Sequence, residues 1–163
     1  MRYGKRDTRA AFHEAGHCLI SMHEGVNVTR LGIEKKTSWN GQRFILKEGW
    51  IRHGRGMTAS LENHILIALA GPTAEKMCPF GMGRFRYQSS LPDVRKMWKT
   101  LDEIGFSDSG RVRYLKQCQS RVERMLRHHW PEITALANAL LERKRLTGMQ
   151  AYTILKEASG DIE

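Results

Sequence analysis

Long hydrophobic runs, paired cysteines and a phosphate-binding loop are all missing from this sequence. No stretch reaches the roughly 18 consecutive apolar residues that a membrane-spanning helix needs, so we expect no membrane span. The first residues, Met1 to Asp7, carry charges with no apolar segment behind them, which is not the pattern of a secretory signal. The pattern G-x-x-x-x-G-K-[S/T], which cradles nucleotide phosphates, does not occur, so no ATPase module is expected in these residues.

Cysteine is also scarce. The three cysteines, Cys18, Cys78 and Cys118, are widely spaced and form no C-x-x-C pair, which argues against a disulfide framework. An odd number of cysteines without an export signal predicts reduced thiols and a cytoplasmic location. We expect Cys18 to be a buried small apolar side chain.

The sequence does contain enough apolar residues for a core. Hydrophobic residues make up 40% of the 163 residues, which suits one domain over 1–163. Lysine and arginine number 27 against 17 aspartates and glutamates, a formal net charge of +10. This charge permits attraction to nucleic acid, to an anionic membrane surface or to acidic polypeptides, and it does not choose among them.

The hydrophobic periodicity predicts mostly helices with a few strands near the N-terminal end. Asp7 or Thr8 is expected to cap the first helix, and Thr58 or Ser60 the second. Gly71-Pro72 predicts a kink or a break within the second helix. The expected helices are 8–22, 61–77, 89–104, 108–127, 131–142 and 151–158, and the expected strands are 26–36, 43–51 and, more weakly, 53–57.

The pentapeptide His13-Glu14-Ala15-Gly16-His17 has the H-E-x-x-H pattern within the first predicted helix. His13 and His17 are four residues apart, so both imidazoles leave the helix on one face and can reach one zinc ion. Glu14 is one residue out of phase and is therefore expected to act as a general base instead of a ligand. The competing interpretation is an amphipathic helix with two surface histidines.

A catalytic zinc site needs a third protein ligand. The sequence does not continue as His-x-x-Gly-x-x-His, so the third ligand must lie elsewhere. From residue type alone the candidates are Asp93, Glu75, His64, His53 and His23.

Several segments, in the same order along the chain, resemble the peptidase domain of FtsH-type AAA proteases. The similarity begins with the helix that carries H-E-x-x-H and spans about residues 6–155. Pro72 departs from the family's Gly-Gly-Arg pattern. The similar segments are Ala11–Ile20, Val28–Ile33, Leu69–Met77, Ser89–Val94, Ile104–Ser107 and Leu136–Arg143.

This resemblance implies a mainly α (α+β) fold, a helical zincin-like peptidase domain with a small β-sheet near the active site. Residues 1–105 would form the half with the zinc site and residues 106–163 a C-terminal helical half. The resemblance implies Asp93 as the third zinc ligand and favours Glu75 as a residue that orients a ligand. The competing interpretations are a helix-start acid for Asp93 and a surface ion pair for Glu75.

The expected function is therefore a zinc-dependent metalloendopeptidase that cuts flexible or unfolded polypeptides without its own ATPase module. Its expected partners are a polypeptide substrate and a separate ATPase or adaptor protein. One alternative is a non-proteolytic regulatory protein that retains a zinc site. Another is a nucleic-acid-binding module, because the helix at 108–127 is rich in arginine, although a solvated basic face is the favoured interpretation of that helix.

Overall fold

The computed structural model describes residues 3–36, 46–54, 60–81, 97–99, 101–103 and 105–160. Its helices are α1 (Lys5–His23), α2 (Leu61–Met77), α4 (Asp108–His128), α5 (Trp130–Arg143) and α6 (Gly148–Ser159). Its strands are β1 (Val28–Lys36), β2 (Leu46–His53) and β3 (Arg145–Thr147). The predicted mainly α fold with a small sheet is confirmed. None of the described helices is long and apolar enough to cross a membrane.

The three strands form one antiparallel sheet in the order β2-β1-β3. Leu31 in the central strand is opposite Ile51 of β2 on one side and Leu146 of β3 on the other. β3 was not predicted, because a strand of three residues with one buried side chain, Leu146, has too little alternation to detect. Of the weak strand expected at 53–57, His53 is the last residue of β2 and Gly54 is not in a strand, and residues 55–57 lie outside the described part.

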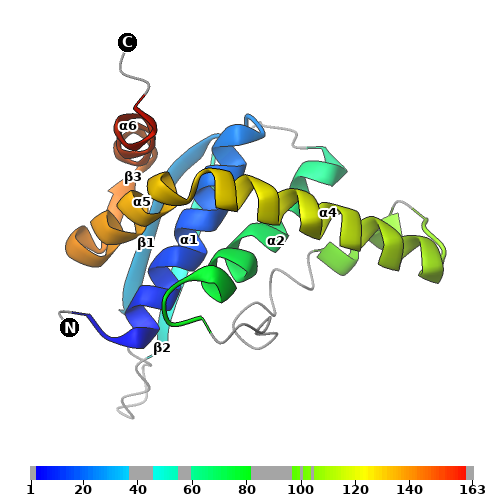
Figure 1. Cartoon of the computed structure of the whole chain (residues 1–163), viewed down its shortest axis with the longest axis horizontal. Coiled ribbons are helices and arrows are strands. Elements are labelled where there is room, and N and C mark those ends of the chain that lie inside the picture. Colours follow the sequence, from blue (N-terminus) through cyan, green and yellow to red (C-terminus); the bar gives the residue numbers. More distant parts are fainter. Residues whose placement is uncertain are drawn as a thin grey trace.

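Helix α1 is the centre of the molecule. It packs against α2, α5, β1 and β2, and Figure 1 shows it between β1 and α2. Every residue from Ala11 to Ser21 is buried. Gly16 allows the close crossing of α1 and α2, since a Cβ there would lie 2.6 Å from the Cβ of Ala74 and 2.7 Å from the carbonyl oxygen of Ala70. The residues that carry the H-E-x-x-H pattern are therefore inside the fold.

The predicted ends of α1 and α2 are partly right. The N-cap of α1 is Gly4, so the expected capping by Asp7 or Thr8 is wrong; the Thr8 hydroxyl instead donates to the Gly4 carbonyl. Ser60 caps α2 and accepts a hydrogen bond from the backbone N–H of Asn63, as predicted. α2 is not broken at Gly71-Pro72, because helical residues continue on both sides of the proline. Of the helix expected at 89–104, the described part includes residues 97–99 and 101–103, which are helical.

Helices α4 and α5 agree with their predicted spans to within about one residue. In α4 the buried residues are Cys118, Val122 and Leu126. Val112, an apolar residue near the start of the same helix, is 51% exposed. Figure 1 shows the reason, since the beginning of α4 extends past α1.

Candidate metal centre

The histidines of the H-E-x-x-H pattern lie side by side in the interior, as the helical spacing predicts. His13 is 8% exposed and His17 is 4% exposed. Their ring centroids are 4.7 Å apart, with the rings nearly perpendicular. Two buried imidazoles on one helical face are unusual unless each nitrogen has a defined partner. The surface-histidine interpretation is therefore wrong.

The Nδ1 atom of each imidazole contacts an oxygen of α2. Nδ1 of His17 is 2.6 Å from the carbonyl oxygen of Ile67. Nδ1 of His13 is 3.2 Å from Oε2 of Glu75. A carbonyl oxygen and a carboxylate accept hydrogen bonds and do not donate them, so both Nδ1 atoms carry the proton. In a neutral imidazole this leaves a lone pair on Nε2.

The two Nε2 atoms face each other at 3.1 Å. Two lone pairs at this distance repel each other unless a cation, either a proton or a metal ion, lies with them. A tetrahedral zinc ion with bonds of about 2.0–2.1 Å places two nitrogen ligands about 3.3 Å apart, close to the spacing found here. Nδ1 donation to a carboxylate or a carbonyl is also the usual way in which proteins orient zinc-binding histidines. The pair therefore fits a zinc ion.

Gly71 provides space beside this pair. A Cβ on Gly71 would lie 2.7 Å from Nε2 of His13 and closer still to Nε2 of His17. A side chain at position 71 would thus occupy the space between the Nε2 atoms of His13 and His17. The sequence predicted only a distortion at Gly71-Pro72. A glycine in an otherwise apolar helix was the available signal, but its closeness to the histidines depends on how α1 and α2 cross.

Glu14 follows His13 on α1 and is 4% exposed. Burial, and secondarily the negative charge of Glu14, raises the pKa of the Cys18 thiol to about 12. Cys18 is therefore a protonated, buried thiol at neutral pH, as expected, and not a thiolate ligand.

The structure places the candidates for the third ligand in different surroundings. Glu75 lies against His13, in the position that its predicted orienting role requires, and this role stays a prediction. His53 Nε2 is 2.9 Å from the Ser21 hydroxyl, and His23 Nδ1 is 3.5 Å from the Glu24 carboxylate. His64 is seven residues before Gly71, about 10 Å along the α2 axis.

Asp93, which the resemblance favours as third ligand, lies outside the described residues. Within the described residues no three histidine, cysteine, aspartate or glutamate side chains gather in a way that could hold a metal ion. The described part thus brings together the imidazoles of His13 and His17, the α2 oxygens that their Nδ1 atoms contact, and the buried Glu14.

No model of a known protein family matches this chain, and no curated protein is significantly similar to it.

Proposed function

We propose that this protein is a zinc-dependent metalloendopeptidase, similar in its catalytic domain to FtsH-type proteases. The observation that carries the proposal is the facing pair of Nε2 atoms, 3.1 Å apart, on two buried histidines. Both Nδ1 atoms are directed to oxygens of α2, which is the usual way in which proteins orient zinc-binding histidines.

His13 and His17 would hold the zinc ion, with Asp93 as the proposed third ligand. Three protein ligands are the usual number in a catalytic zinc site. Bound zinc would supply Lewis-acid chemistry, activating water and polarising the carbonyl oxygen of the substrate. Glu75 keeps the imidazole of His13 in one tautomer and one orientation, because its carboxylate accepts the Nδ1 proton.

Glu14 is the proposed general base. Its carboxylate takes a proton from the attacking water and delivers it to the nitrogen of the leaving amine, which completes the cleavage of the peptide bond. The Cys18 thiol beside Glu14 stays protonated and does not compete for the metal.

The proposed substrates are flexible or already unfolded polypeptides. The 163 residues include no nucleotide-binding loop with which to unfold a substrate. A separate ATPase or an adaptor protein is proposed to deliver substrates that this chain cannot unfold. The zinc-dependent cutting step itself would not need ATP.

The test combines metal analysis with peptide hydrolysis. The purified chain is expected to bind one zinc ion and to cleave an unfolded substrate such as casein. Glu14→Gln should retain zinc and lose at least about 100-fold in kcat, the usual contribution of a general base. Glu142→Gln, which changes an exposed glutamate of α5, is the matched control and should retain full activity.

Absence of bound zinc, or full activity of Glu14→Gln, would contradict the proposal. Stoichiometric zinc without hydrolysis of any polypeptide would instead favour the non-proteolytic regulatory protein. Asp93→Asn tests the third ligand, since it should weaken zinc binding while Asp102→Asn, at an exposed partner of Arg111, should not.

A further inference from the structure

The solvent-facing side of α4 carries a broad, open polar surface. It lies on the side of the helix opposite the buried residues Val122 and Leu126. All of its described lining residues come from this one helix: Arg113, Lys116, Gln117, Ser120, Glu123, Arg124 and Arg127.

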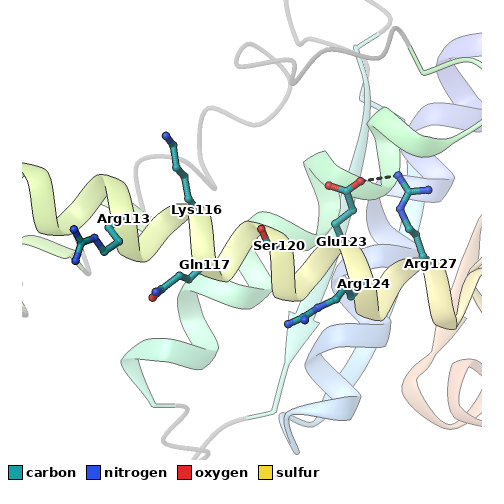
Figure 2. A pocket seen from close by; sticks show the side chains of 7 residues that line it. All are labelled: Arg113, Lys116, Gln117, Ser120, Glu123, Arg124 and Arg127. Carbon is teal, nitrogen blue, oxygen red and sulfur yellow. Dashed lines mark hydrogen bonds and ion pairs between the residues drawn. The ribbon is translucent and has the colours of Figure 1, made fainter.

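These side chains form two rows. Figure 2 shows Lys116, Glu123 and Arg127 extending to one side of the helix and Arg113, Gln117 and Arg124 to the other, with Ser120 between the rows. Each row has a cation at both ends. Arg113 and Arg124, like Lys116 and Arg127, are eleven residues apart, or about 16 Å along the helix axis.

Only one of the seven lining residues is acidic. Glu123 pairs with Arg127 through a contact of 2.6 Å between Oε1 and Nη2. The hydrogen bond from Arg127 lowers the pKa of Glu123, so its carboxylate remains ionised at neutral pH. The four cations exceed this single acid, and the surface has a net positive charge.

The same surface has no apolar side chain among its described lining residues. Protein–protein interfaces centre on buried tryptophan, tyrosine and arginine and are poor in lysine, and the described lining residues here include arginine but no aromatic side chain. A helix that lies on a membrane also needs an apolar face to insert. A surface with cations and neutral hydrogen-bonding groups is instead typical of nucleic-acid binding. The cations contact the phosphates, and the neutral groups contact base edges in a groove.

We propose that α4 docks into the major groove of double-helical DNA. The groove is about 12 Å wide and admits one α-helix, whose diameter is about 10–12 Å. The row with Arg113 and Arg124 would contact the phosphates of one strand, and the row with Lys116 and Arg127 those of the other. Ser120, between the two rows, is small enough to let the helix approach, and its hydroxyl can hydrogen-bond to a base edge.

The opposite side of α4 is fixed to the rest of the fold by side chains of α1 and α2 and the residues next to them. The Gln119 side-chain amide donates to the Thr73 hydroxyl at 2.9 Å. Arg121 pairs with Glu24 at 3.0 Å and with Glu62 at 2.8 Å, connecting α4 to the end of α1 and the start of α2. This proposal does not depend on zinc or on peptidase activity.

The experiment measures binding of the full chain to a fluorescent DNA duplex of mixed sequence over a range of salt concentrations. Four phosphate contacts predict a slope of log K against log salt of about −3 to −4. Arg113→Gln with Arg124→Gln should weaken binding about 10-fold or more at low salt and reduce the slope by about 2. The control, Arg143→Gln with Lys156→Gln, removes two exposed cations from α5 and α6 and should change affinity less than about 3-fold.

Glu123→Gln should tighten DNA binding, because it removes the acid that neutralises Arg127, whereas Glu142→Gln on α5 should have little effect. Duplex RNA should bind more weakly, because its deep, narrow major groove does not admit a helix. An equal loss of DNA affinity in the α4 double variant and in the control double variant would overturn the proposal. Binding to duplex RNA, phosphatidylserine vesicles or polyglutamate as tight as binding to duplex DNA would overturn it too. Melting curves of every variant show whether folding is preserved.

Discussion

Gly71 leaves open the space next to the two histidines because it has no side chain. A methyl group there would lie in the space flanked by the two histidine Nε2 atoms. Both nitrogens belong to side chains held from behind by Ile67 and Glu75, so they cannot move aside without losing those hydrogen bonds.

Gly71→Ala is therefore expected to abolish or severely weaken zinc binding. Alanine favours helix over glycine by about 1 kcal/mol, so α2 itself should still form. Competition with a chromophoric zinc chelator measures the affinity, and circular dichroism of the metal-free protein checks the helix content. Zinc binding as tight as in the parent chain would show that the metal, if bound, does not occupy this space.

The residues of the candidate centre differ in how far sequence could reveal them. The spacing of His13 and His17 places both on one face of a helix, which is local geometry. The Glu75 carboxylate and the Ile67 carbonyl reach the imidazoles only because α2 crosses α1, and no periodicity encodes that crossing. Glu75 was singled out from family similarity, whereas a backbone carbonyl such as that of Ile67 leaves no trace in residue type.

At the scale of elements, sequence predicted the interiors better than the ends. The apolar stripes located α1, α2, α4 and α5, because burial of one face dominates their stability. Weaker local effects decide the ends. Gly4 caps α1 in place of Asp7 or Thr8, and α6 begins at Gly148, three residues before the expected start. The start of α6 coincides with the end of β3, which sequence did not predict.

Thr147 closes β3 and caps α6, so one side chain connects the two elements. Its hydroxyl accepts from the backbone N–H of Gln150, and the Gln150 side chain accepts from the backbone N–H of Thr147. Thr147→Ala should lower the free energy of unfolding by about 1 kcal/mol, or the melting temperature by about 2–4 °C. Differential scanning calorimetry measures both values.

Thr153→Ala is the matched control, because Thr153 is an exposed threonine within the same helix and its hydroxyl only donates to the Met149 carbonyl. Its melting temperature should stay near that of the parent chain. An equal loss in both variants would mean that the capping box contributes nothing measurable to α6.

At the scale of the whole molecule, the fold encloses α1 on several sides. The sheet, α2 and α5 all pack against it, and β3 returns the chain to the edge of β1 opposite β2. This enclosure buries His13, Glu14 and His17. The three cysteines, Cys18, Cys78 and Cys118, are buried as well. Desolvation is the largest cause of a raised pKa at each of these thiols.

These raised pKa values make the stability of the whole fold sensitive to alkaline pH. In the unfolded chain a thiol loses its proton near its ordinary pKa of 9.0, whereas Cys18 in the folded protein keeps its proton up to about pH 12. Unfolding above pH 9 therefore releases protons, so the stabilisation is complete below about pH 9 and declines as the pH rises towards 12. The melting temperature of the metal-free protein should fall over this range.

Cys18→Ala separates this thiol from other groups that titrate at alkaline pH, since the variant should show a shallower decline above pH 9 even if its melting temperature at pH 7 is lower. A thiol reagent at pH 8 provides a second measurement, because all three cysteines should react only as the chain unfolds. A decline as steep in Cys18→Ala as in the parent chain would mean that Cys18 does not contribute. Rapid modification of Cys18 in the folded protein would place its thiol at the surface, and with it the helix face that carries Glu14.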